Sequence, residues 1–222
     1  MNRIFIYSLL LLLLAGCSTN KDTTTNTIIQ DVEKTETSTQ KVNVMPVSTD
    51  TYIPNPQVID DTSLLATGDF YRDRKGEGTL KALDGETKSI QVDSIKLTVK
   101  DAKIIDYRPA YSLIDFYHTY THDEQFTFIK FFVEMENQSD EQKKFSPIAF
   151  VQTNTGEMIT WEKDIYLEEL NGVLNPGERK SGNIGFIVEN SAIKTMQLST
   201  SDVYTEQEKL LDKAKTLDFH FD

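Results

Sequence analysis

The sequence predicts a mainly β protein, an antiparallel sandwich or barrel, over most of its length. Between about Asp61 and Asp222, aromatic and β-branched residues alternate with polar ones, and turn signals recur roughly every ten residues. The chain of 222 residues can hold one such domain with additions, or two small domains. Its hydrophobic content of 38% and charged content of 26% are typical of a folded globular body.

The first long strand is predicted around residue 100. Apolar and polar residues alternate from Ile95 to Val99, which indicates a half-buried strand. The apolar positions change phase near Lys100-Asp101, because Ala102 and Ile104 continue the apolar face. This change of phase predicts a β-bulge.

The clearest strand runs from Phe126 to Asn137. Its odd-numbered apolar residues are predicted to face the core: Ile129, Phe131, Val133 and Met135. Its even-numbered face is apolar at one end, with Phe126, Phe128 and Phe132, and acidic at the other. We expect another segment, with the C-terminal tail as the candidate, to cover these phenylalanines, since an open apolar patch is less common.

Glycine-containing turns separate the later strands. Asn154-Thr155-Gly156 predicts a hairpin that joins residues 145–153 to residues 157–161. Asn175-Pro176-Gly177 predicts a second turn. Alternating apolar residues after these turns predict further strands, at Ile184, Phe186, Val188, Met196 and Leu198.

The C-terminal tail departs from the strand pattern. Thr205-Glu206-Gln207-Glu208 fits a capping box in which Thr205 is the N-cap. An apolar stripe follows at Leu210, Leu211 and Ala214. These features predict a short C-terminal helix over about residues 205–215. A final strand is expected from the alternation of Leu217, Phe219 and Phe221.

The N-terminus has the features of an export signal. Arg3 precedes an apolar run of 11 residues, Ile4 to Leu14, which is too short to cross a hydrocarbon core of about 30 Å. The run leads into Leu14-Ala15-Gly16-Cys17, which resembles the lipobox of bacterial lipoproteins, and Cys17 is the single cysteine of the chain. The resemblance implies that residues 1–16 are a signal peptide and that Cys17 is diacylated. The protein is then anchored to the membrane through Cys17, on the extracytoplasmic face of the cell membrane.

A disordered polar spacer is predicted after the lipidated cysteine, over residues 17–60. Of the 34 residues from Ser18 to Thr51, 16 are Ser, Thr or Asn, and such a stretch buries too little surface to offset chain entropy. As a random coil it would span on the order of 35–40 Å and hold the domain away from the membrane. Residues 61–84 are assigned to an N-terminal extension, for which a loose hairpin is one interpretation, and residues 85–222 to the sandwich.

Four segments of the predicted sandwich carry a family resemblance. They are Phe126–Asn137, Phe145-Ser146-Pro147, Asn154-Thr155-Gly156, and Leu174-Asn175-Pro176-Gly177-Glu178 leading to Ser181-Gly182. Over about residues 85–204, their order and spacing resemble the telokin-like, immunoglobulin-like domain of many Gram-positive lipoproteins, a domain of unknown function. The resemblance implies an immunoglobulin-like antiparallel β-sandwich and no catalytic residues.

One segment between two strong strands is rich in aromatic residues. Residues 107–124 hold five aromatic rings and two histidines. Loops on rigid scaffolds often carry binding residues, and tyrosine offers contact area at little cost in entropy. The candidate recognition loop therefore contains Tyr107, Tyr111, Phe116, Tyr117 and Tyr120. The alternative is another strand or short helix whose rings pack inward.

His118 and His122 are the candidates for a metal site. On a helix, their spacing of four places both imidazoles on one face, which suits a metal ion. On a strand, which Thr119 to Thr121 favour, the two side chains lie roughly 13 Å apart. The strand is the preferred interpretation, and no metal or other cofactor is expected.

Charge and motif content disfavour several classes of function. The formal net charge of −12, which becomes −13 without Arg3, disfavours a nucleic-acid partner. A single cysteine rules out an intramolecular disulfide. The sequence has no nucleophile elbow and no phosphate-binding or dinucleotide-binding loop, and it offers no nucleophile–base pair, so we expect no enzyme.

These expectations combine into a lipid-anchored surface protein that presents an immunoglobulin-like binding module. Its partner is expected to be a protein or a component of the cell envelope. The alternative is a solute- or metal-binding lipoprotein that uses residues His118–Glu124.

Overall fold

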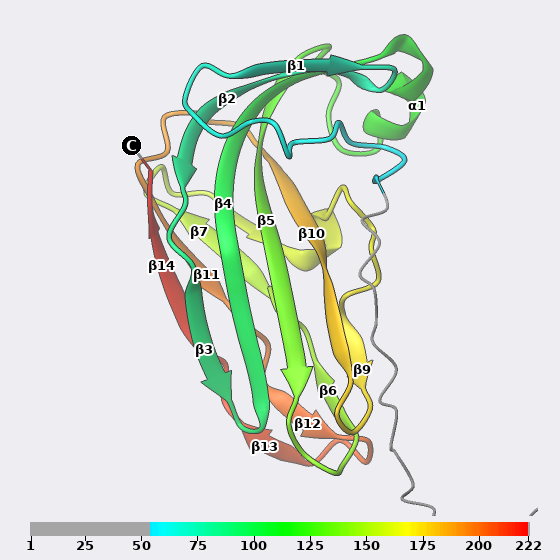
Figure 1. Ribbon diagram of the computed structural model, residues 1–222, viewed down its shortest axis with the longest axis vertical. Coiled ribbons are helices and arrows are strands. Elements are labelled where there is room, and N and C mark those ends of the chain that lie inside the picture. The colour runs from blue at the N-terminus through cyan, green and yellow to red at the C-terminus, as the bar shows by residue number, and fades with distance from the viewer. Residues whose placement is uncertain (1–53, 222) are drawn as a thin grey trace, which may run out of the picture. The chain divides into compact units, whose positions relative to one another are not determined.

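The computed structural model describes residues 54–221, and this part of the chain confirms the predicted antiparallel β architecture. A six-stranded sheet forms one layer, and two four-stranded sheets lie against its inner face (Figure 1). No helix within these residues is long and apolar enough to cross a bilayer. The predicted signal peptide, Cys17 and the spacer up to residue 53 lie outside the described residues.

The large sheet has the strand order β1-β2-β4-β5-β10, and β3 pairs with the first part of β4. Its strands are β1 (Phe70–Asp73), β2 (Gly76–Asp84), β3 (Lys88–Val92), β4 (Ile95–Pro109), β5 (Phe126–Asn137) and β10 (Arg179–Val188). The register between β4 and β5 shifts between Val99 and Asp101, which confirms the predicted bulge. The extra residue allows both Val99 and Ala102 to face the sandwich interior.

Two smaller sheets complete the sandwich. One has the order β14-β11-β7-β8 and the other the order β13-β12-β6-β9. Their strands are β6 (Lys143–Phe145), β7 (Phe150–Thr153), β8 (Met158–Thr160), β9 (Gly172–Leu174), β11 (Thr195–Ser199), β12 (Val203–Thr205), β13 (Leu210–Asp212) and β14 (Thr216–His220). In the described part of the chain, three short helical turns connect strands: η1 (Tyr111–Leu113), α1 (Ile114–Tyr117) and η2 (Trp161–Lys163).

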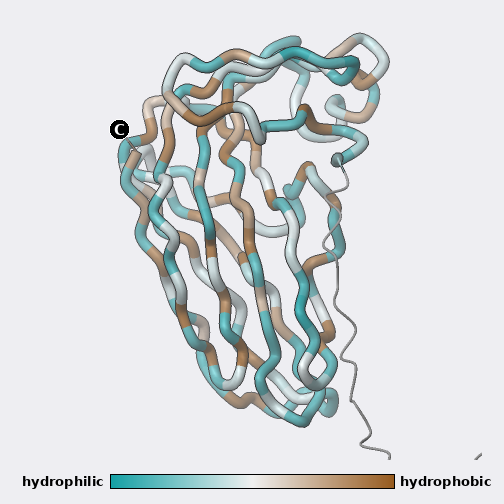
Figure 2. Tube along the Cα trace, viewed as in Figure 1, coloured by the Kyte–Doolittle hydropathy of each residue, from teal (hydrophilic) through white to brown (hydrophobic). Residues whose placement is uncertain are grey.

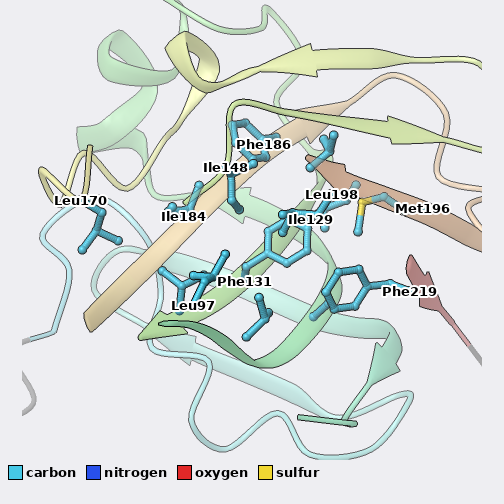
Figure 3. Packing of buried hydrophobic residues seen from close by; sticks show 14 of the residues in the cluster. Leu97, Ile129, Phe131, Ile148, Leu170, Ile184, Phe186, Met196, Leu198 and Phe219 are labelled. Carbon is cyan, nitrogen blue, oxygen red and sulfur yellow. The ribbon is translucent and has the colours of Figure 1, made fainter. Parts of the chain in front are cut away.

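The main core lies between the large sheet and the two small sheets. Apolar residues recur between polar ones along the long strands (Figure 2), and one apolar face of each layer points inward. Figure 3 shows this packing, in which the rings of Phe131 and Phe219 meet edge to face with centroids 5.6 Å apart. Full burial of each such ring stabilises the fold by about 1.5–3 kcal/mol. Ile129 and Met135 also belong to this core, as the odd-numbered pattern predicted.

A second apolar cluster lies on the opposite face of the large sheet. We call it the cap cluster, and its buried members are Val58, Ile59, Leu64, Leu80, Ile105, Tyr107, Tyr117, Phe126, Phe128, Ile165 and Tyr166. Consecutive residues such as Phe128 and Ile129 belong to different clusters, because successive side chains of a strand point to opposite faces. Residues 54–66 cross β4 and β5 and cover this face (Figure 1).

The expected cover is present over Phe126 and Phe128, although not over Phe132, and the covering segment is not the C-terminal tail. Phe126 and Phe128 are buried under residues 54–66 and α1. Phe132 is half-buried, with the Lys130 ammonium 5.6 Å from its ring centroid. The N-terminal segment supplies this cover because Val58, Ile59 and Leu64 are themselves apolar and become buried there.

Buried charges hold the N-terminal segment to the sheet. Lys103 on β4 and Lys130 on β5 are paired directly across the sheet, and both side chains are buried. Two like charges in this position repel each other. Asp61 lies between them, with its Oδ2 atom 2.7 Å from Lys103 Nζ and 3.1 Å from Lys130 Nζ. Burial acts to raise the pKa of Asp61, but the two ammonium groups together hold that pKa below its usual range.

The structure places the N-terminal boundary of the folded body earlier than the sequence did. Residues 54–60, assigned to the spacer, pack on the sheet, and Val58 is fully buried. Residues 61–84 contain the hairpin of β1 and β2, in agreement with one interpretation of this segment. β2 also pairs with β4, so the hairpin extends the large sheet.

The helix predicted over about residues 205–215 is replaced by a hairpin of β12 and β13. The Thr205 hydroxyl accepts a hydrogen bond from the amide of Lys209, and the Thr205 amide donates to the Lys209 carbonyl at 2.9 Å. Glu208 adopts a left-handed conformation (φ 62°), which closes the turn. Pairing of β12 with β6 on its other side and burial of Val203 outweigh the narrow apolar stripe of an isolated helix. The α-helix within residues 54–221 is α1, and the final strand is β14.

Candidate binding groove

The rings of the predicted recognition loop are mostly turned inward. Tyr107 lies on β4 and Tyr117 at the end of α1, and both are buried in the cap cluster. Phe116 and Tyr120 are half-buried and pack against that cluster. Tyr111 alone among the five candidates is exposed, at 90%. The inward-packing alternative therefore describes four of these five residues.

The buried tyrosine hydroxyls attach the cap to the sheet. Tyr107 donates to the carbonyl of Lys75 at 2.7 Å, and Tyr117 donates to the carbonyl of Gln57 at 2.9 Å. Burial raises the pKa of both phenols well above the usual range. Both tyrosines remain neutral hydrogen-bond donors at physiological pH, and their positions are fixed.

His118 and His122 lie close together in the turn after α1. Their ring centroids are 5.5 Å apart, so the extended strand that would separate them by 13 Å is wrong. Both residues are exposed. Within residues 54–221, no group of three or more His, Cys, Asp or Glu side chains is placed to hold a metal ion. These two imidazoles supply at most half of a tetrahedral zinc site.

An open groove lies beside the segment that joins β8 to β9. Its volume is about 650 Å³. The lining residues are Trp161, Glu162, Asp164, Leu167, Glu169, Leu170, Asn171, Val173, Lys180 and Ile184. Leu170 and Ile184 also belong to the main core (Figure 3), so the groove floor is fixed by core packing. Trp161 and Leu167 are 47% and 54% exposed, which is high for large apolar side chains.

Asp164 organises the loop that forms one wall of the groove. Its Oδ1 atom accepts hydrogen bonds from the amides of Tyr166 (3.0 Å) and Gly185 (2.9 Å), and its Oδ2 atom accepts one from Leu167 (3.2 Å). Burial raises the pKa of Asp164 above its usual range, although the three amides favour the charged form. Leu167 and Glu169 adopt left-handed conformations, with φ of 56° and 51°. Each such conformation costs on the order of 1–3 kcal/mol, which the fixed loop must offset.

Glu168 connects this loop to β10 and to the N-terminal segment. Its carboxylate accepts hydrogen bonds from the Asn183 amide at 2.7 Å and from the Asn55 side chain at 3.0 Å. Asn55 also donates to the carbonyl of Tyr166 at 2.8 Å. The loop is therefore held from the sheet on one side and from the cap on the other, and it presents Leu167 in a fixed position.

The polar atoms of the groove are mainly hydrogen-bond acceptors. Glu169 forms no ion pair with any residue between 54 and 221, whereas the carboxylate of Glu162 interacts with Thr160 and with the neighbouring Lys163. The Oδ1 atom of Asn171 is buried and receives no hydrogen bond from the described chain. Lys180 lies at the groove, and its Nζ atom donates to the carbonyl of Val173 at 3.0 Å. A ligand that donates hydrogen bonds or carries positive charge fits this arrangement.

Sequence reasoning did not identify this groove. The available signal was Trp161, the single tryptophan of the chain, at the end of a predicted strand. It is followed by an acidic loop without strand alternation, residues 162–171. The register of β10 against β5, which brings Ile184 and Lys180 to the same place, depends on tertiary pairing.

The comparisons with known proteins give relatives without an assigned function. A family model described as a domain of unknown function, DUF4352, matches residues 86–209. An uncharacterised protein of Bacillus subtilis strain 168, YdhF, is 40% identical over 238 aligned positions that cover both chains completely.

Two solved structures are similar to part of the chain at low identity. A functionally unknown protein of Listeria monocytogenes EGD-e is 12% identical, with a TM-score of 0.48 over 66% of this chain and 87% of its own. A conserved hypothetical protein of Bacillus anthracis is 13% identical, with a TM-score of 0.32 over 59% of this chain and 94% of its own. The groove loop lies inside the family match, whereas residues 54–85 lie outside it.

Proposed function

The chain belongs to the DUF4352 family of domains of unknown function, and we propose that it is a lipid-anchored protein of the cell surface that binds a protein or cell-envelope partner. The lipobox at Cys17 supports the location, on the extracytoplasmic face of the membrane. The groove beside Trp161 supports the binding role. Together these features favour a binding module over an enzyme, since no nucleophile and base can be paired in the sequence.

The observation that carries the binding role is the exposure of Trp161 and Leu167 on a fixed loop. Burying either large side chain in a partner gains about 1.5–3 kcal/mol. The loop is held by Asp164 and Glu168, so little conformational entropy is lost when a partner binds. Tryptophan is also enriched among residues that dominate binding energy at interfaces.

A photo-crosslinking experiment in intact cells tests the binding role. A photoreactive amino acid replaces Leu167 in the groove or, as a control, Leu210 on β13, which is also an exposed leucine. We expect a discrete crosslinked product from position 167 that Trp161→Ala removes, and none from position 210. Equal crosslinking at both positions, or a product at 167 that ignores Trp161→Ala, contradicts a binding role for the groove.

The alternative function, binding of a metal ion at His118 and His122, is favoured by the 5.5 Å separation of the two rings. Two exposed imidazoles alone leave the metal's other positions to water, which predicts weak binding. Calorimetry with zinc, copper and manganese tests this alternative. Heat that is lost in His118→Ala/His122→Ala would support it, and no heat with any of the three ions would remove it.

A further inference from the structure

The groove offers negative charge and hydrogen-bond acceptors next to an aromatic ring. The carboxylate of Glu169 has no ion-pair partner among residues 54–221, and the buried Oδ1 atom of Asn171 has no donor there. The carboxylate of Glu162 is exposed beside them and interacts with Thr160 and Lys163. An unsatisfied buried acceptor in a native fold calls for an explanation, and a bound donor is one. The indole of Trp161 is 47% exposed, and an indole is the best aromatic partner for an ammonium or guanidinium group.

The groove also follows the outer edge of β10, which the loop of residues 164–170 covers in part. β10 is the last strand of the large sheet and pairs along its length with β5. On its other side, Phe186 forms an isolated bridge with Asp164, and the Ile165 amide donates to the Gly185 carbonyl. On this side, carboxylate oxygens of Asp164 and Glu168 also accept the amides of Gly185 and Asn183.

Lys180 lies nearer the start of β10 and lines the groove. Toward the start of β10, residues 179–181 pair with β5 and form no bridge on the outer side within the described chain. This part of the edge can accept an extended polypeptide through main-chain hydrogen bonds, with side chains of the added strand entering adjacent pockets.

We propose that the groove binds an extended, basic segment of another protein, with an Arg or Lys side chain against Trp161, Glu162 and Glu169. An apolar neighbour in the same segment would contact Leu167 and Val173, which are 54% and 37% exposed. This inference rests on the proposed function, because it names the chemical class of its partner. The net charge of −12 favours approach of a basic segment over long distances at low salt.

Charge complementarity also ranks the other possible occupants. A second copy of the chain carries the same large negative charge and is repelled. Residues 18–53 of the chain hold three lysines against five Asp or Glu residues, so they match an acidic groove poorly. A basic segment of a separate protein is the occupant that the groove complements best.

Trp161 fluorescence tests this inference directly, because it is the single tryptophan of the chain. The full lipidated protein in a neutral detergent is titrated with three synthetic peptides in which valine alternates with arginine, glutamine or glutamate. We expect a saturable change in Trp161 emission with the Arg–Val peptide, at least tenfold weaker binding of the Gln–Val peptide, and none of the Glu–Val peptide. Equal affinity for all three peptides, or binding of none, overturns the proposal.

Charge-neutralising variants distinguish the contribution of the groove carboxylates to peptide binding from that of the overall negative charge of the domain. The variant Glu162→Gln/Glu169→Gln should bind the Arg–Val peptide with at least tenfold lower affinity. The variant Glu206→Gln/Asp218→Asn has the same change in net charge away from the groove, and its affinity for the peptide should change less than twofold. Equal effects of the two variants overturn the assignment to the groove. If the first variant fails to fold, the salt dependence of wild-type binding decides, because an affinity that does not fall as salt rises contradicts a basic ligand.

The other occupants appear as distinct results in the same experiment. If Trp161 emission changes with protein concentration in the absence of peptide, a second copy of the chain occupies the groove. A Trp161 shielded from acrylamide in the free protein and insensitive to every peptide indicates that the chain itself fills the groove. Either result overturns the basic partner. Crosslinking at residue 167 that depends on Trp161 would still support the proposed function, so the two failures can be told apart.

Discussion

The main core and the cap cluster occupy opposite faces of one sheet and are built by different means. In the main core, apolar side chains from three sheets interdigitate, as Phe131 and Phe219 do. In the cap cluster, apolar rings are combined with buried charges and phenol hydroxyls, including Asp61 between Lys103 and Lys130. The stability of the main core depends on the close fit of apolar side chains, whereas the stability of the cap also depends on each buried polar group keeping its partner. Loss of one partner in the cap therefore leaves another group buried and unsatisfied.

The largest expected effect concerns the main core. Phe131→Ala should lower the free energy of unfolding by about 3–5 kcal/mol, because it leaves a cavity beside Phe219. Urea unfolding followed by circular dichroism measures the loss. Phe70→Ala, at an exposed position, is the control and should change stability by less than about 0.5 kcal/mol. A loss below about 1.5 kcal/mol would contradict the tightly packed core inferred for this site.

The next effect concerns the buried charges of the cap. Asp61→Asn should cost about 3 kcal/mol, because Lys103 and Lys130 then face each other without their shared carboxylate. Asp101 remains 3.1 Å from Lys130 and keeps the loss at the lower end of the range for such variants. The same urea unfolding measures it, with Asp115→Asn at an exposed position as control.

A triple variant sharpens the comparison between charges and packing. Replacing Asp61, Lys103 and Lys130 together by leucine removes the three buried charges, leaves Asp101 with its carboxylate partly exposed to solvent, and should restore wild-type stability or exceed it. A triple variant as unstable as Asp61→Asn would show that the cap needs these polar groups for its geometry. That result would contradict the expectation that the buried charges of Asp61, Lys103 and Lys130 add little net stability compared with apolar side chains.

The pH dependence of stability should differ between the two regions. The pKa of Asp61 is held below its ordinary value, so its stabilising contribution is complete above the unfolded-state pKa of about 3.9 and is lost as the pH falls below it. The stability difference between wild type and Asp61→Asn should therefore be constant from about pH 7 to 5 and shrink below about pH 4. Phe131→Ala should show no such change in its difference from wild type. Unfolding curves at each pH measure both differences, and a wild-type advantage that grows on acidification would contradict the lowered pKa.

The smallest effect concerns the link between the cap and the groove. Asn55→Ala removes hydrogen bonds to Tyr166 and Glu168 and should cost about 1–2 kcal/mol. Its local effect should be larger, because the groove loop loses both of its hydrogen bonds to Asn55 and keeps the packing of Ile165 and Tyr166 in the cap cluster. Hydrogen exchange of residues 164–171 should rise at least tenfold, while β5 stays protected. Gln207→Ala is the control, and equal exchange in both variants would mean that the cap does not hold the groove.

The sequence predicted the main core better than the cap or the groove. Alternation along β5, the bulge near Asp101 and the turn at Gly156 are local signals, and each appears where expected. The capping box at Thr205 is also local, but pairing of β12 with β6 overrode it. The cap required knowledge of which distant segment covers Phe126 and Phe128. A lysine within that apolar strand face, Lys130, was the available signal that a carboxylate had to be buried beside it.

The candidate site was harder to predict than the fold for a similar reason. Aromatic residues between Tyr107 and Tyr120 were nominated for recognition, and four of the five are buried or half-buried at the cap cluster. Composition alone does not distinguish rings that pack inward from rings that face a partner. The loop that follows Trp161 is held by the β10 edge and by Asn55, and the contact of Asn55 with Tyr166 spans more than a hundred residues of sequence.

The most direct test of the surface-protein account compares wild type with Cys17→Ala by intact mass and membrane partitioning. Wild type should be cleaved before Cys17, carry two acyl chains and sediment with membranes. Cys17→Ala should keep its N-terminal residues or be processed elsewhere, and it should carry no lipid. Wild-type protein that is recovered unmodified and free of membranes would contradict the account and would leave Cys17 as a free thiol.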